Sequence, residues 1–236
     1  MQFEGNKLRH EYKYYINYEA YQILRTRLID IIGRDENMDS EDGYLVSSLY
    51  FDDIYDSAME EKLAGTRFRK KFRIRVYERN DKQIKLECKM KYDTYISKIS
   101  ASLSSEEYTS ILSGDYEFLA KRKEAVCLEL YMLRKTSLLK PVLVVEYRRE
   151  AYVSNYGNVR ITFDKDIAVS YDSLDMLYSE CPVTGILPEG RMVLEVKYDD
   201  YLPSYIGSLL QIGEAEKCAI SKYVMCRKQN FEIKNY

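Results

Sequence analysis

Ions alternate with apolar side chains along residues 71–91, KFRIRVYERNDKQIKLECKMK, and this alternation limits what the chain can fold into. In the first half, Arg73 and Arg75 alternate with apolar residues. The second half places four ions at alternate positions: Lys85, Glu87, Lys89 and Lys91. Because successive side chains of a β-strand point to opposite faces, the period of two predicts two strands, each with one apolar and one ionic face. Asn80 and Asp81 lie between the halves and are typical turn residues, which favours a hairpin.

The same periodicities predict the other elements of the chain. We predict strands over residues 8–16, 46–51, 141–153, 159–163 and 192–198. Apolar residues at helical spacing predict helices over 18–32, where Gly33 ends the pattern, over 118–133, and over most of 204–228. Ser104 and Glu107 have the spacing of a capping box, for a helix that ends near Gly114. We find no repeat, linker or low-complexity segment and expect a single domain over residues 1–236.

Overall charge and cysteine content exclude several classes of protein. The net charge of the chain is only −2 and its pI is about 5.7, so any basic site must be a local concentration of charge rather than a general affinity for nucleic acid. The five cysteines contain no C-x-x-C pair, which favours reduced thiols over disulfides or a zinc site. No segment approaches the roughly 20 apolar residues of a membrane span. We expect a soluble, cytoplasmic protein without a nucleic-acid partner.

Missing motifs remove several enzyme classes. His10 is the only histidine, which argues against a Ser-His-Asp triad or a multi-histidine metal centre. The sequence also lacks the glycine-rich loops that bind the phosphates of nucleotides through backbone N–H groups. If this protein binds phosphate, its side chains must do so.

The ionic faces of the predicted strands allow two interpretations. An antiparallel sheet with one face in water is common and would explain any single strand. However, Arg160, the pair Glu195 and Lys197, and either Arg148 or Arg149 repeat the pattern, and like charges on neighbouring strands repel. Closing the sheet into a barrel of about eight strands would turn these faces inward, with helices packed outside. We therefore predict an α+β fold with an antiparallel β-barrel whose hydrated, basic interior accepts a polyanion.

Eight short motifs, in this order and spacing, resemble the VTC domain, the polyphosphate polymerase module of vacuolar transporter chaperone complexes. They are RHEYKYYI at 9–16, SLYFDD at 48–53, RKKFRIRVY at 69–77, KLECKMK at 85–91, EYRREAY at 146–152, VRITFD at 159–164, VLEVKY at 193–198 and ISKY at 220–223. This family is grouped with the CYTH phosphatases as triphosphate tunnel metalloenzymes. The resemblance implies a tunnel of antiparallel strands in which basic residues bind a triphosphate and carboxylates hold Mn²⁺ or Mg²⁺.

The resemblance also implies which residues form the site. Those that match the family's phosphate-binding positions, or extend them along the same faces, are Lys13, Arg73, Arg75, Lys89, Lys98, Arg149, Arg160, Lys197, Ser221 and Lys222. Among these, Arg73, Arg75 and Lys222 are the catalytic candidates. Glu195 matches the metal-binding carboxylate, and Glu11 and Glu87 are further metal candidates.

Some of these residues have alternative explanations. Glu87 would otherwise pair with Lys85 or a tunnel arginine, Lys222 would be an exposed helix lysine, and Ser221 would only cap a helix or pack. We expect Lys85, Lys91 and Arg9 to line the tunnel without a defined role.

Two departures from the family patterns bear on function. CYTH phosphatases begin with E-x-E-x-K, whereas this chain has Arg9 in place of the first glutamate, which favours a polymerase over a hydrolase. Ser100 stands where a basic residue is expected. The resemblance thus implies a metal-dependent phosphotransferase, a polyphosphate polymerase that moves the γ-phosphoryl group of ATP to a polyphosphate chain, with a membrane protein as a candidate partner. The alternatives are a metal-dependent triphosphatase and a non-catalytic module that binds polyphosphate or another triphosphate.

Overall fold

One antiparallel sheet dominates the computed structural model, which describes residues 2–3, 6–38, 40–178, 181–211 and 218–234. Its main path runs through eight strands in the order β3 (His10–Ile16), β12 (Met192–Tyr198), β10 (Val159–Ser170), β9 (Lys140–Ser154), β5 (Tyr44–Asp52), β6 (Phe68–Tyr77), β7 (Asn80–Tyr92) and β8 (Tyr95–Leu103). Off this path, β4 (Gly33–Arg34) pairs with β9, and β11 (Thr184–Gly185) pairs with β10. Strands β1 (Gln2–Phe3) and β2 (Asn6–Lys7) form a separate hairpin.

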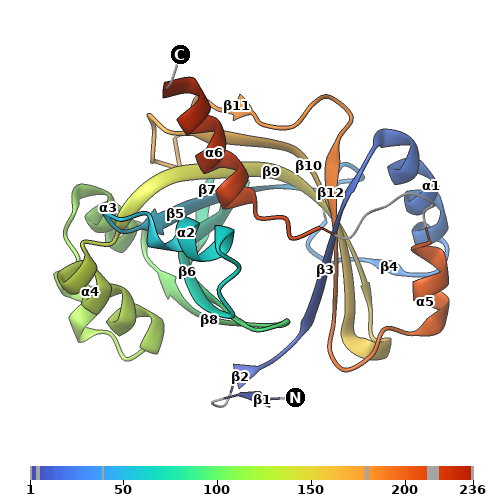
Figure 1. Ribbon diagram of the computed structural model, residues 1–236, viewed down its shortest axis with the longest axis horizontal. Coiled ribbons are helices and arrows are strands. Elements are labelled where there is room, and N and C mark those ends of the chain that lie inside the picture. The colour runs from blue at the N-terminus through green and yellow to red at the C-terminus, as the bar shows by residue number, and fades with distance from the viewer. Residues whose placement is uncertain (1, 4–5, 39, 179–180, 212–217, 235–236) are drawn as a thin grey trace.

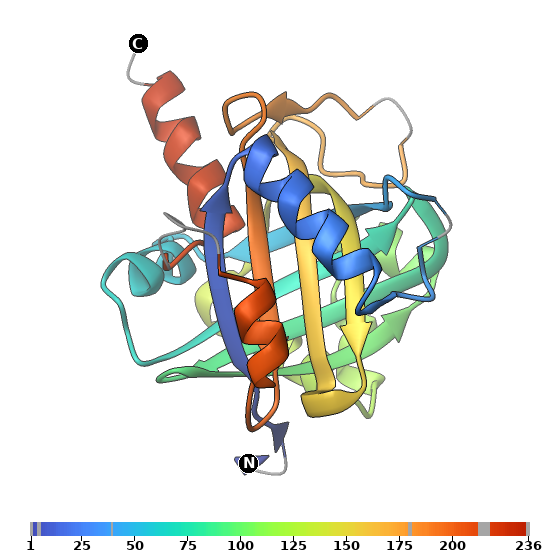
Figure 2. The ribbon, with the colours of Figure 1, turned by 90° about the vertical axis from the view of Figure 1, so that its right-hand side faces the viewer.

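The sheet curls until its first and last strands meet. Figure 1 shows the strands curving around an open centre, and Figure 2 shows β3, β12, β10 and β9 side by side across one wall. Arg9, just before β3, forms an antiparallel bridge with Ile96 of β8 through two backbone hydrogen bonds of 3.0 Å. The predicted antiparallel barrel is therefore confirmed, although its edges meet at one bridge and not along a continuous ladder in the described part of the chain.

Six helices and two 3₁₀ turns surround the sheet in the described residues. They are α1 (Tyr18–Ile29), α2 (Ser57–Leu63), α3 (Ser105–Ser113), η1 (Glu117–Lys121), α4 (Ala125–Ser137), η2 (Tyr156–Asn158), α5 (Ser204–Leu209) and α6 (Lys222–Lys234). Apolar residues that alternate with the inner ions form two outer cores. Leu86 of β7 packs with Tyr108 and Leu130 of α3 and α4, and Phe163 of β10 packs with Leu24 of α1. These helices shield the outer faces, as the α+β prediction requires (Figure 1).

Helix α6 packs on the inner side of the sheet, together with Met59 of α2. Its Tyr223 and Val224 join Tyr50, Tyr147 and Val193 in a third apolar cluster. Tyr147 and Val193 lie two residues from Arg149 and Glu195 on their strands and therefore share the inner face with them. Part of the barrel interior is thus apolar, which the prediction of helices only on the outside did not include.

The turn of the charged hairpin lies two residues earlier than predicted. Tyr77 pairs with Asn80, so Glu78 and Arg79 form the two-residue loop, both with positive φ. Tertiary contacts hold these residues in a conformation that usually favours glycine. The Glu78 carboxylate accepts a hydrogen bond from the Leu45 N–H at 2.6 Å, and Arg79 donates to Glu146 at 2.6 and 2.9 Å.

Three predicted helices are shorter or broken in the structure. Helix α1 ends at Ile29, and Gly33 joins the sheet as part of β4. The helix predicted over 118–133 is interrupted after η1, where Arg122 turns back to bond Glu107 and Glu124. The helix predicted over 204–228 is split into α5 and α6, and residues 212–217 lie outside the described residues.

Other elements agree closely with the prediction, and some elements were not predicted. The capping box of Ser104 and Glu107 is present, and Gly114 ends α3 in the left-handed conformation. Strand β12 has the predicted bounds, whereas β10 continues seven residues beyond Phe163 to Ser170. The sequence patterns did not single out β8 or α2. No helix among the described residues is both long enough and apolar enough to cross a bilayer.

Candidate anion-binding site in the barrel

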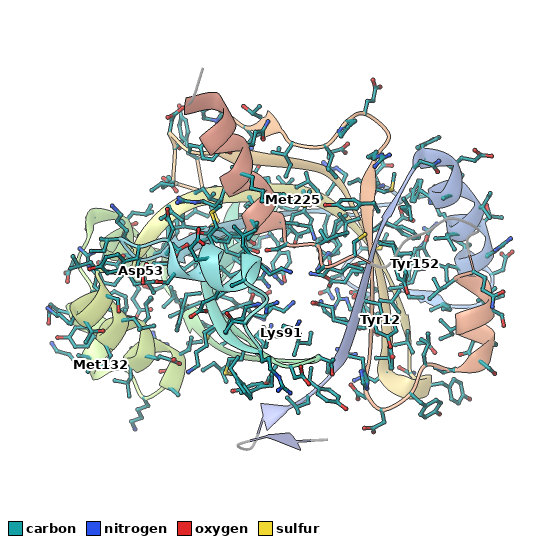
Figure 3. All side chains as sticks on the ribbon, viewed as in Figure 1. Tyr12, Asp53, Lys91, Met132, Tyr152 and Met225 are labelled. Carbon is teal, nitrogen blue, oxygen red and sulfur yellow. The ribbon has the colours of Figure 1, made fainter. Side chains whose placement is uncertain are left out.

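The predicted ions gather on the inner face of the barrel because of strand register. Arg73 pairs with Glu87, which pairs with Ser100 of β8, so these positions lie side by side on one face. The residues between them, such as Phe72 and Cys88, are buried in the outer core. In Figure 3, Lys91 lies at the edge of the open centre, whereas Tyr12 lies on the other side of β3. Lys85, opposite Arg75 in the register, belongs to the same face.

Glu87 is a buried carboxylate surrounded by cations. Arg73 Nε donates to it at 2.8 Å, Lys98 Nζ donates at 2.6 Å, and Arg75 lies 3.5 Å away. Burial alone would raise the pKa of Glu87, but Arg73 and Lys98 outweigh this effect and hold it at about 2. Arg73 also donates to the Tyr50 hydroxyl at 3.1 Å. Glu87 is therefore placed to fix the orientation of Arg73, as its alternative explanation expected, and its oxygens already have partners.

Glu11 and Glu195 share the same lysines on β3 and β12. Lys13 Nζ lies 3.1 Å from Glu195 and 3.4 Å from Glu11, and Lys197 forms ion pairs with both carboxylates. Lys89 of β7 donates to Glu11 at 2.6 and 2.8 Å. Burial would raise the pKa values of both carboxyl groups, yet the lysines hold Glu11 at about 2 and Glu195 well below its ordinary value. Both groups are thus ionised.

This pair of carboxylates fits a hard divalent cation. Mg²⁺ and Mn²⁺ prefer oxygen ligands and are commonly bound by one or two carboxylates together with phosphate oxygens. Within the described ranges, no three His, Cys, Asp or Glu side chains are grouped closely enough to hold an ion by themselves. Glu195 and Glu11 would therefore hold a metal together with a bound phosphate, whereas Glu87 lies among different cations.

Asp164 is a site residue that the sequence reasoning missed. Arg149 donates to both of its oxygens, at 2.6 and 2.8 Å, and Lys222 forms an ion pair with it. Arg149, and not Arg148, is therefore the inward arginine of β9. Lys222 is 8% exposed and its ammonium lies 4.7 Å from the centre of the Tyr147 ring, so the explanation of an exposed helix lysine is wrong. Arg160, Thr162 and Asp164 are two residues apart along one strand, so side-chain alternation could have placed the Asp164 carboxylate on the inner face.

Lys71 is the second missed residue, and it has no carboxylate partner within the described residues. Its ammonium donates to Ser221 Oγ at 3.0 Å and lies 5.2 Å from the centre of the Tyr223 ring. Burial and then the charges of Lys13, Lys89, Arg69 and Lys62 lower the pKa of Lys71 well below 10.5. Ser221 thus contacts a cation in addition to accepting from the Val224 N–H. Lys71 and Arg69 continue the alternation of Arg73 and Arg75 along the same strand, so the sequence pattern could have identified Lys71 as an inward residue.

Neighbouring cations are destabilised in the same way. Burial and like charges lower the pKa of Lys62 on α2 to about 8 and also lower the pKa of Lys91, and burial lowers the pKa of Arg69. The pKa of Lys89 is lowered to about 7 by burial, despite its contact with Glu11. The barrel interior therefore holds an excess of positive charge, although the whole chain carries a net charge of −2. A bound polyanion would relieve this repulsion.

Two predicted residues have their partners outside this group. Arg160 donates to the Tyr44 hydroxyl at 3.0 Å and pairs with Asp35 at 2.8 Å. Arg9 pairs with Asp199 at 3.0 Å, beside the bridge that joins β3 to β8. The guanidinium of Arg9 thus sits at the rim, so the preference for a polymerase must rest on other features. His10 stacks against Tyr198 and Tyr95 at ring distances of 4.8 and 4.9 Å on the outer side of β3.

The fold resembles solved structures at low sequence identity. A Bacillus halodurans protein provisionally named as an adenylate cyclase has 16% identity and a TM-score of 0.51, with 88% of each chain covered. A Vibrio parahaemolyticus protein with the same provisional name has 10% identity and a TM-score of 0.51, covering 94% of this chain and 98% of that one. The mimivirus capping enzyme triphosphatase is more distant, with 15% identity, 88% of each chain covered and a TM-score of 0.41. These similarities concern the fold alone.

Sequence similarity identifies the family. No curated protein matches this chain. The sequence model of the VTC domain, however, matches residues 8–231, which is nearly the whole chain and includes every residue of the site described above. The chain therefore belongs to the VTC domain family.

Proposed function

We propose that the chain is a metal-dependent polyphosphate polymerase that transfers the γ-phosphoryl group of ATP to the end of a polyphosphate chain inside the barrel. The observation that supports this most strongly is the group of inward cations around Lys71, because Lys71 itself has no carboxylate partner among the described residues, and burial and the charges of its neighbours lower its pKa. Such a lining is unfavourable when empty and favourable when several closely spaced phosphates enter. Membership of the VTC domain family favours polymer synthesis over other reactions of triphosphates.

The side chains would act by positioning and by electrostatic stabilisation. Arg73 and Arg75 can each donate two hydrogen bonds to phosphate oxygens, and Glu87 holds both guanidinium groups in place. In the transfer, the bond between the γ-phosphorus and the bridging β–γ oxygen breaks. A terminal oxygen of the polyphosphate chain forms the new bond, and ADP leaves. Lys71, Lys89 and Lys222 would stabilise the charge that spreads over the transferred group.

This reaction needs no general base. The attacking oxygen belongs to an ionised phosphate and carries no proton that must be removed. His10, the only imidazole of the chain, packs between tyrosines outside the barrel. When bound between Glu195 and Glu11, Mn²⁺ or Mg²⁺ would neutralise charge on the phosphate oxygens.

Binding of a triphosphate should be accompanied by proton uptake. The fold lowers the pKa of Lys71 below its ordinary value of 10.5, so the unfolded chain holds this proton more tightly than the folded protein does. The free energy of unfolding of the empty protein should therefore rise with pH, from the lowered pKa of Lys71 in the folded protein up to 10.5. A bound anion reverses the shift. Between the pKa of about 8 of Lys62 and the ordinary 10.5, tripolyphosphate should therefore bind with uptake of protons and bind more weakly as pH rises.

Calorimetric titrations in buffers with different heats of ionisation would measure this uptake. Lys71→Met should reduce it by up to about one proton per bound anion, because one titrating ammonium is removed. Lys82→Met, a change at an exposed lysine of the same hairpin, serves as the control. Equal uptake in the wild type and in Lys71→Met would show that Lys71 does not face the anion.

Product analysis tests the proposed reaction itself. The purified protein is incubated with ATP and Mn²⁺, and the products are sized on a gel. A ladder of long polyphosphate is expected. A triphosphatase, in which water replaces the phosphate acceptor, would release only orthophosphate or pyrophosphate, and a binding module would leave ATP unchanged.

A further inference from the structure

A cavity of about 410 Å³ lies outside the barrel wall, between α2 and α4, where β6 begins and β7 ends. Phe68, Phe72 and Tyr92 contribute aromatic surface to it, and Arg69 and Lys91 are also among its lining residues. The latter two alternate with Lys71 and Lys89 along their strands, so they belong to the inner face of the barrel as well. The cavity and the basic lining of the barrel therefore share two residues at the end of this wall.

Strand register places aromatic and cationic pairs next to each other at this point. Phe68 pairs with Tyr92, and in the next step of the ladder Arg69 pairs with Lys91. The rings of Phe68 and Tyr92 are 5.9 Å apart in an edge-to-face arrangement. One residue along a strand corresponds to about 3.3 Å. Because side chains of neighbouring residues point to opposite faces of the sheet, Phe68 and Tyr92 lie on the cavity side, whereas Arg69 and Lys91 lie on the inner side at the same end of the ladder. The end of this wall thus offers a surface for a planar ring on one side and cations for a phosphate on the other.

The cavity is also suited to a ligand that is partly polar. Phe68 is 61% exposed, which is unusual for an aromatic side chain at the start of a strand, and its face is available for stacking. Glu61 of α2 lines the cavity too, and no described residue donates a hydrogen bond to its carboxylate, so it can accept one from a ligand. The volume lies within the range of pockets that hold small molecules, about 300–1,000 Å³.

We propose that this cavity binds the nucleoside of a nucleoside triphosphate whose phosphates lie in the barrel. The base stacks on Phe68, and an amino or ribose hydroxyl group donates to Glu61. Arg69 and Lys91 contact the phosphate nearest the ribose. The inference rests on the proposed function, because it requires a triphosphate in the barrel, and it adds the reason why the protein would distinguish a nucleotide from an inorganic triphosphate.

Titrations of ATP and of inorganic tripolyphosphate into the same variants test this proposal. Phe68→Ala should weaken ATP binding by roughly tenfold, the effect of losing one stacked base. Tripolyphosphate has no base and should bind Phe68→Ala within about twofold of the wild type. Tyr156→Ala serves as the matched control, since Tyr156 is also an exposed aromatic residue but does not line the cavity.

The outcomes separate this proposal from the proposed function. A loss specific to ATP supports the nucleoside site. If the wild type binds both ligands and Phe68→Ala binds both normally, or loses both equally, the nucleoside site is wrong while the barrel remains a triphosphate site. If the wild type binds neither ligand, this proposal and the proposed function are both wrong.

Discussion

Replacing Arg73 by alanine is expected to lower the turnover of ATP by about 100- to 1,000-fold, the usual cost of losing one preorganised contact to a developing negative charge. Arg73 lies on the inner face, where Glu87 and the Tyr50 hydroxyl hold its guanidinium in place. The protein should remain folded, because Lys98 and Arg75 still neutralise the buried Glu87 after the substitution. Steady-state kinetics and a thermal melt, recorded on the same sample, would measure both properties.

Arg67→Ala is the matched control for this variant. Arg67 lies two residues before Arg69, and its side chain is 74% exposed and pairs with Asp93 in solvent. Loss of this exposed charge should change turnover by less than about threefold, and the change should shrink at high salt. Wild-type turnover in Arg73→Ala would show that the inner face of the hairpin is not where phosphate reacts.

Glu195→Gln is expected to remove most of the metal dependence and to lower turnover by about 100-fold or more. The substitution takes one negative charge from the group formed by Glu11, Glu195, Lys13 and Lys197. With fewer anions to hold a divalent cation, activity should rise little as Mn²⁺ is added. Metal-free tripolyphosphate should bind at least as tightly as in the wild type, because Lys13 and Lys197 each lose a competing partner.

Glu87→Gln distinguishes a metal ligand from a carboxylate that only organises cations. Glu87 contacts Arg73, Arg75 and Lys98, and none of these lysine and arginine contacts is shared with Glu195. We expect this variant to lose stability and activity while its Mn²⁺ titration keeps the wild-type midpoint. If Glu195→Gln kept the wild-type midpoint and Glu87→Gln shifted it, the metal assignment would have to move to Glu87.

The sequence predicts the walls of the barrel well because side-chain alternation is a local property. The period of two placed Arg73, Arg75 and Lys89 on one face without any knowledge of tertiary contacts, and the register confirms that they share it. Residues that depend on distant partners were harder to predict. The loop at Glu78 and Arg79 adopts positive φ because Leu45 and Glu146 bond to it, and neither contact is visible in a local pattern.

Charge compensation was only partly predictable from the sequence. Pairing of Glu87 with a tunnel arginine was one of the expected alternatives, whereas Asp164 lies between cations that come from β9 and from α6. The sequence gives no register between β9, β10 and α6, so Asp164 could not be assigned to Arg149 and Lys222. For the same reason, no local pattern indicated that Tyr223 and Val224 of α6 would pack inside the barrel, although the family resemblance placed Ser221 and Lys222 at the site.

A crystal structure of the protein with tripolyphosphate and Mn²⁺ would test the central claim most directly, because the anomalous signal of manganese locates the ion independently. We expect the anion inside the barrel, in contact with Arg73, Lys71 and Lys89, and the manganese beside Glu195 and Glu11. Tripolyphosphate bound only outside the barrel, with Glu195 still paired to Lys13 and Lys197 and no manganese near it, would contradict the claim.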